Sequence, residues 1–172
     1  MAGRGGQPEA RHVGTGSIRC LPNIGMQEVA AQTTTPSAAL KAIGVAYVRF
    51  GVGNPAHYRL MFGTSLTTAH HAEAGNCMPS VVAEAAGAAK RLLRDVIRQG
   101  AEQGHFVVPP NDTEALDMAV LSAWSLVHGL TVLLIDGLAS EGMPLTPCTA
   151  SAAEGIAGHV TQLLLDGIAR KA

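Results

Sequence analysis

The sequence predicts an all-α protein that folds as a helical bundle. Apolar residues make up 47% of the chain, and most are alanine, leucine or valine, of which alanine and leucine are strong helix formers. They recur at three- and four-residue spacings, and no run of alternating β-branched residues competes with that pattern. At 172 residues the chain is long enough for one domain, which buries roughly 70% of the surface of the unfolded chain.

Residues 1–35 are predicted to be a mostly flexible segment, and residues 36–172 to be the folded domain. Glycines, prolines and the run of threonines at 33–35 interrupt the first segment too often for a long element. Only a short helix around residues 27–32 is compatible with it.

The first helix of the domain is predicted over residues 36–52. Thr35 is a good N-cap, and Pro36 suits the first helical position. Gly53 can close the helix in a left-handed conformation, and a short helix over residues 56–62 follows it. One face of the first helix carries a stripe of large apolar residues, namely Leu40, Ile43, Tyr47 and Phe50.

Three further helices are predicted beyond a polar, glycine-bearing loop at 64–77. The first begins at Ser80 and ends near Gly100 and Gly104, with a buried stripe of Val82, Ala85, Ala89, Leu92 and Val96. The second runs from about 113 to 136, after Asn111 and Glu114 at capping-box spacing. The last begins at Thr149 or Ser151, after a loop with Pro144 and Pro147, and its inner face carries Ile156, Val160, Leu163 or Leu164, and Ile168.

Charge and cysteine content favour a reduced, cytoplasmic protein that does not itself bind nucleic acid. The net charge is −1, whereas nucleic-acid-binding proteins carry a clustered basic excess. Cys20, Cys77 and Cys148 are widely spaced and form no CxxC pair, and the N-terminus lacks the apolar core of a signal peptide. The uncharged run 118–135 contains serines, a histidine, a glycine and a threonine, which favours a helix buried on both sides over a membrane span.

No catalytic, metal or cofactor motif is present in the sequence. It contains no GxSxG, P-loop, HExxH or GxGxxG pattern, and its acidic residues are spread singly. His70, His71, Glu73 and Cys77 lie in one predicted loop, but without the spacing of metal ligands, so no metal site is predicted there. The basic residues Lys90, Arg91, Arg94 and Arg98 are interpreted as a solvated helix face.

Three stretches together resemble one family. They are AIGVAYVRFGVGNPAHYRLMFG at 42–63, AWSLVHGLTVLLIDG at 123–137 and GIAGHVTQLLLDGI at 155–168. Their order resembles the C-terminal domain of TetR-type transcriptional regulators, the WHG domain, named for the residues that stand here as Trp124, His128 and Gly129. The resemblance covers about residues 36–170.

The resemblance implies a bacterial regulator whose C-terminal bundle binds an unknown lipophilic effector and forms a homodimer. DNA would be bound only through an N-terminal domain, which residues 1–35 do not resemble and which we expect to be missing or truncated. In the family the last two long helices pair with their copies in a second subunit. That implies a dimer contact at Val132, Ile156, Val160 and Leu164.

The candidate effector pocket is predicted from the rare aromatic residues. Four of the six aromatics fall within sixteen residues of each other, and the resemblance places their helices beside the Trp-His helix. The predicted pocket residues are Tyr47, Phe50, Tyr58, Met61, Phe62, Trp124 and His128. The same residues would equally serve as ordinary core, and Gly129 is interpreted as a site where another helix packs closely.

A second hypothesis from another functional class stays open. The chain would then be a standalone small-molecule-binding protein, or a small helical enzyme, that reuses the same bundle. Neither hypothesis requires a cofactor.

Overall fold

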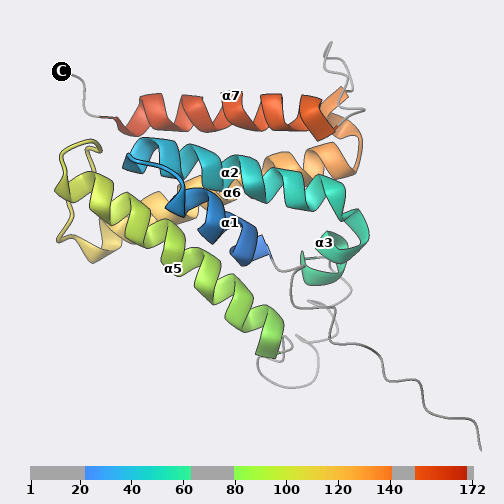
Figure 1. Cartoon of the computed structure of the whole chain (residues 1–172), viewed down its shortest axis with the longest axis horizontal. Coiled ribbons are helices and arrows are strands. Elements are labelled where there is room, and N and C mark those ends of the chain that lie inside the picture. The colour runs from blue at the N-terminus through green and yellow to red at the C-terminus, as the bar shows by residue number, and fades with distance from the viewer. Residues whose placement is uncertain (1–21, 63–79, 141–149, 170–172) are drawn as a thin grey trace, which may run out of the picture.

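The computed structural model of the chain describes residues 22–62, 80–140 and 150–169 (Figure 1). These ranges contain helices and no strand of a sheet, which confirms the predicted all-α bundle. In chain order the elements are α1 (Pro22–Ala31), α2 (Pro36–Gly53), α3 (Pro55–Phe62), α5 (Ser80–Glu102), α6 (Thr113–Ile135), the short 3-10 helix η2 (Leu138–Ser140) and α7 (Ala150–Ile168). Several residues singled out from the sequence lie outside the described ranges, namely Cys20, His70, His71, Glu73, Cys77, Pro144, Pro147 and Cys148.

Helix α2 is the central element of the bundle, because it packs against α1, α5, α6 and α7. In Figure 1, α7 lies along one side of α2, while α1 and α5 lie on the other side and α5 crosses obliquely. Helix α3 follows at the C-terminal end of α2. Helix α2 therefore contributes to most of the internal packing surfaces of the bundle.

Helix α1 corrects part of the prediction for the N-terminal segment. Residues 22–31 were predicted to be mostly flexible, with at most a short helix at 27–32, but they form a helix that packs on α2 and α5. Met26 is 4% exposed, and Val29 and Ala30 pack against the core. A ten-residue helix is marginal by its own propensity, so tertiary packing stabilises it, and local sequence patterns give no signal of that packing.

Helix α2 begins as predicted but ends differently. The Thr35 side chain accepts a hydrogen bond from the Ala38 N–H at 3.2 Å, and Pro36 occupies the first turn. Gly53 is the last helical residue and is not among the glycines with positive φ. Asn54 caps the helix instead, because its side-chain amide donates to the Phe50 carbonyl at 3.0 Å.

The end of α5 is built around two glycines with different roles. Gly104 has φ +75°, its N–H donates to the Ala101 carbonyl, and the His105 N–H donates to the Gly100 carbonyl at 2.8 Å, which is a Schellman cap. Gly100 lies inside the helix and does not end it, because α5 continues to Glu102. A glycine is needed there because a Cβ would be 2.2 Å from the ring of the fully buried Phe106. The buried side of α5 also differs slightly from the predicted stripe: Leu93, Val96 and Ile97 are buried, while Ala89 and Leu92 are half-buried.

Within the subunit, helix α6 is buried on one face only, so the described residues do not supply the predicted burial on both sides. Its buried residues are Leu116, Ala123, Val127, Thr131 and Leu134, a single stripe. Of the described helices, this one is long and apolar enough to cross a membrane by length and composition, and 22% of its most apolar window is buried inside the chain. The N-cap is Asp112, whose carboxylate accepts from the Ala115 N–H at 3.0 Å, and not Asn111. The helix ends at Ile135, and Gly137 follows with φ +75°.

The inner face of α7 is lined mostly by small residues. Ala153, Ala157, Thr161 and Leu165 are buried along it, while Ile156, Leu164 and Ile168 pack at its margin. Leu163, offered with Leu164 as an inner-face residue, is 60% exposed and points outward. Small residues on the buried stripe let α7 lie close to α2, which a stripe of large residues would prevent.

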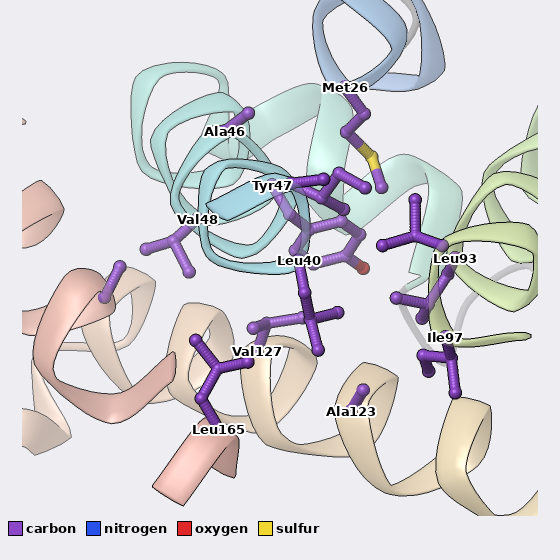
Figure 2. Packing of buried hydrophobic residues seen from close by; sticks show 14 of the residues in the cluster. Met26, Leu40, Ala46, Tyr47, Val48, Leu93, Ile97, Ala123, Val127 and Leu165 are labelled. Atoms are coloured by element: carbon purple, nitrogen blue, oxygen red, sulfur yellow. The ribbon is translucent and has the colours of Figure 1, made fainter. Parts of the chain in front are cut away.

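Two close helix contacts in the core occur where two glycines of α2 meet two threonines. A Cβ at Gly44 would lie 2.7 Å from Oγ1 of Thr161 on α7, and one at Gly51 would lie 2.2 Å from Cγ2 of Thr131 on α6. Both threonines are at most 1% exposed, and each hydroxyl donates to a carbonyl one turn earlier in its own helix. Figure 2 shows part of the apolar core, in which Leu40 and Tyr47 of α2 and Leu93 of α5 belong to one buried cluster.

Candidate ligand-binding site

An apolar cavity of about 40 Å³ lies between the helices of the bundle, against α2. Every α-helix of the described ranges contributes to its wall, so only the complete bundle forms it. The lining residues are Met26, Leu40, Ile43, Gly44, Tyr47, Met61, Phe62, Ala86, Ala89, Lys90, Leu93, Ala123, Trp124, Val127, Thr161 and Leu164.

The spacing along α2 and α6 explains which side chains reach the cavity. Leu40, Ile43 and Tyr47 recur at three- and four-residue steps and share one face of α2. Ala123 and Val127 lie four residues apart on the buried stripe of α6, with Trp124 beside them at its edge. Alanines on the facing stretch of α5 leave the space that larger side chains would fill.

A cluster of hydrogen-bonded polar side chains lies at the wall of the cavity, where α2, α3 and α6 meet. The Tyr58 hydroxyl is 2.7 Å from Nδ1 of His128, the Tyr47 hydroxyl is 3.0 Å from the same nitrogen, and the two hydroxyls are 3.3 Å apart. The Trp124 indole N–H donates to the Tyr47 hydroxyl at 3.4 Å. These four side chains therefore satisfy one another inside a largely apolar environment.

Burial keeps this cluster uncharged at neutral pH. Loss of hydration raises the pKa of both Tyr47 and Tyr58 above the ordinary value of 10.0. The same loss of hydration lowers the pKa of His128 below its ordinary value of 6.5. The cluster thus presents hydroxyl, indole and neutral imidazole groups, and no ionised one.

The rings of the cluster also pack on one another. The ring centroids of Tyr58 and Phe62 are 4.9 Å apart, those of Phe62 and His128 are 5.0 Å apart, and those of Trp124 and His128 are 5.5 Å apart. Tyr47 meets Tyr58 edge to face at 6.0 Å. Aromatic residues far apart in the sequence are thereby packed together in one cluster.

The structure brings together most of the residues predicted for the pocket. Tyr47, Met61, Phe62 and Trp124 line the cavity itself. Tyr58 and His128 belong to the adjoining cluster and do not line the cavity, while Phe50 is half-buried and belongs to neither group. Apart from Phe50, the predicted pocket residues are therefore neighbours in space. That they bind a ligand stays a prediction.

The residues predicted for dimerisation lie partly on the outer surface of the subunit and partly against its core. Val132 is 36% exposed on the outer face of α6, but Ile156 and Leu164 pack against the core of the same subunit and Val160 is half-buried. A Cβ at Gly129 would meet nothing within 4 Å, so the predicted close approach of another helix is not made there within the subunit.

Several residues of the cavity wall were not predicted for the pocket, and Met26 and Lys90 are the most informative of them. Met26 comes from α1, for which the sequence offers no clear pattern. Lys90 belongs to the basic run interpreted as a solvated face, and its Nζ lies 4.5 Å from the centre of the Trp124 ring. Its position next to Ala89 and three residues before Leu93 was a signal that it borders the buried face of α5.

The described residues contain no group of three or more histidine, cysteine, aspartate or glutamate side chains that could hold a metal ion. The hydrogen bonds to the His128 ring come from Tyr47 and Tyr58, which are neutral groups. The arrangement can therefore enclose an apolar molecule and offer neutral hydrogen-bonding groups at one wall.

Fold and cavity together define an all-α bundle domain with an internal apolar cavity. A family model described as "Tetracyclin repressor-like, C-terminal domain" matches residues 40–158. The chain belongs to this family, as the resemblance implied. Searches of curated proteins and of solved structures give no match to the chain.

Proposed function

We propose that this chain is the effector-binding and dimerisation portion of a TetR-family transcriptional regulator. Domains of the family generally dimerise and bind small-molecule effectors. In this role the bundle senses the effector, DNA is contacted through an N-terminal domain, and the protein works in the bacterial cytoplasm. We assign the bundle no catalytic activity.

The observation that carries the effector-binding role is the apolar cavity with its aromatic wall. Protein interiors are close-packed, and voids larger than a water molecule are few. A cavity of about 40 Å³ is more than the 10–15 Å³ that a single water needs, and it is lined almost wholly by apolar groups. Such a site favours a lipophilic ligand, with the Tyr47–Trp124 wall orienting it.

The size of the cavity also indicates how a ligand would enter. Pockets for drug-sized ligands measure about 300–1,000 Å³, so the site must widen on binding. Met26 and Met61 lie in its wall, and methionine is unbranched and adapts its shape readily. Because Met26 comes from α1, a ligand that widens the site pushes against the helix nearest the N-terminal segment.

The outer face of α6 supports the dimerisation role. Met118, Leu121, Val132 and Leu133 are between 36% and 55% exposed on this helix. They lie opposite its buried stripe, so a single subunit leaves a long apolar face in water. A homodimer that covers α6 and its neighbour α7 would bury roughly 1,200–2,000 Å² in total.

The ligand role is tested by filling the cavity. Ala89→Phe places a ring inside the site, while Ala38→Phe adds the same ring at an exposed position of α2. Lipophilic compounds are screened by thermal shift, where a hundredfold excess over the dissociation constant stabilises by about 2.7 kcal/mol. The wild type and Ala38→Phe should respond to the same compounds, and Ala89→Phe should not. Equal stabilisation of all three proteins would place the ligand elsewhere and contradict the proposal.

The dimer role is tested with two exposed leucines. Leu121→Glu puts a charge on the outer face of α6, and Leu60→Glu puts one on α3, where Leu60 is 61% exposed. Light scattering at micromolar concentration should show dimers for the wild type and for Leu60→Glu, and monomers for Leu121→Glu. A wild type that is monomeric under these conditions would exclude the dimer.

A further inference from the structure

The polar side chains that line the cavity differ in whether they already form hydrogen bonds with other described residues. Four polar side chains reach it, namely those of Tyr47, Lys90, Trp124 and Thr161. The Thr161 hydroxyl donates to the Ala157 carbonyl at 2.7 Å, and Trp124 donates to Tyr47, whose hydroxyl contacts Tyr58 and His128. Three of the four therefore have hydrogen-bond partners in the part of the chain that the structure describes, whereas Lys90 forms no hydrogen bond there.

Lys90 carries an unneutralised positive charge at the edge of an apolar site. Among the described residues it forms no ion pair, whereas Arg94 pairs with Asp117 and Arg98 pairs with Asp95 on the same helix. The described lining contains no aspartate or glutamate. The Lys90 ammonium lies over the face of Trp124, which holds the charge beside the cavity.

We infer that the ligand of this site is a lipophilic anion, whose apolar body occupies the cavity and whose carboxylate or similar acidic group binds Lys90 at the rim. The inference rests on the proposed ligand-binding function and specifies its chemistry. An ammonium has three N–H donors and no acceptor, so the complementary group is an anionic oxygen. Lys90 is exposed, so the acidic group stays in contact with water and does not pay the cost of full burial.

A neutral or cationic ligand matches the wall less well. A neutral lipophile gains the apolar contacts but leaves the Lys90 donors to water. A cation would lie close to Lys90 and near the same face of Trp124, which that ammonium already covers. Ligands that share one apolar tail but carry a negative, neutral or positive head group should therefore bind this site with different affinities.

The experiment uses octanoate, 1-octanol and octylammonium, which share one tail. Trp124 is the only tryptophan of the chain, so its fluorescence reports binding at this wall directly. The full chain is titrated as wild type, Lys90→Gln and Arg91→Gln. Arg91 is the matched control, since it is an exposed neighbouring cation that does not line the cavity.

The quantity to compare is the ratio of octanoate affinity to octanol affinity. Lys90→Gln should lower this ratio about three- to tenfold, the range of a partly exposed charge-assisted contact, because octanoate loses a charged partner that octanol does not need. Arg91→Gln should leave the ratio as in the wild type, and octylammonium should bind most weakly. Added salt should reduce the ratio in the wild type, because it screens an exposed charge.

Two different failures separate this inference from the function on which it rests. If octanol binds but Lys90→Gln leaves the ratio unchanged, or Arg91→Gln lowers it equally, the anion preference is overturned and the lipophilic site stands. If none of the three compounds binds, the inference and the proposed ligand site are both overturned.

Discussion

Replacing Gly51 with alanine tests whether close contact between α2 and α6 determines the stability of the bundle. The added Cβ would lie 2.2 Å from Cγ2 of Thr131 and 3.0 Å from Cδ2 of Tyr58. Neither neighbour moves easily. Thr131 is fully buried and its hydroxyl donates to the Val127 carbonyl at 2.6 Å, while Tyr58 is held by His128. The two helices must therefore separate.

The expected magnitude follows from two opposing effects. Overpacking of a well-packed core costs about 1–3 kcal/mol, and occasionally more. Alanine is favoured over glycine inside a helix by about 1 kcal/mol, which offsets part of that cost. We expect Gly51→Ala to lower the free energy of unfolding by about 1–2 kcal/mol, the overpacking range less part of the propensity gain.

Urea unfolding followed by circular dichroism measures this change, with two further variants. Gly53→Ala is the control on the same helix, since its Cβ would meet nothing within 4 Å, and its stability should be unchanged or slightly higher. Thr131→Ser removes the clashing methyl group and keeps the hydroxyl, so Gly51→Ala should cost less in that background. The reasoning is refuted if Gly51→Ala is as stable as Gly53→Ala, or if Thr131→Ser brings no relief.

Four other substitutions, one of them a control, test the polar cluster and a helix cap. Tyr58→Phe removes the hydroxyl 2.7 Å from His128 and should lower the free energy of unfolding by about 1–2 kcal/mol in urea. An unchanged free energy of unfolding would show that this hydrogen bond does not stabilise the fold. Burial lowers the folded-state pKa of His128 below 6.5, so the unfolded chain binds that proton more readily than the folded chain. The free energy of unfolding should therefore be highest above about pH 6.5 and fall as the pH drops below that value. It should level off once the pH is below the folded-state pKa of His128. His128→Gln should remove this part of the pH dependence and His105→Gln, at an exposed position, should keep it; identical profiles for both would contradict the assignment. Gly104→Ala should destabilise by about 1 kcal/mol because φ is +75° there, and an unchanged urea midpoint would contradict the Schellman cap.

The sequence alone predicted the fold class, the four long helices and the family. Strong helix formers at helical spacing, Thr35 followed by Pro36, and the Trp124–His128 stretch are local signals, and each depends on residues a few positions apart. The same signals placed Tyr47 and Trp124 as neighbours in one wall, because the resemblance supplied the order of the helices. Both residues line the cavity in the structure.

Only the tertiary structure decided which residues complete that wall and which faces stay exposed. Met26 reaches the cavity from a helix too short to be stable alone, and Lys90 reaches it from the edge of a face interpreted as solvated. Gly44 and Gly51 approach α7 and α6, whereas Gly129 meets nothing within its own subunit. These outcomes depend on distances between helices remote in sequence, and spacing along one helix shows which residues share a face but not what packs against that face.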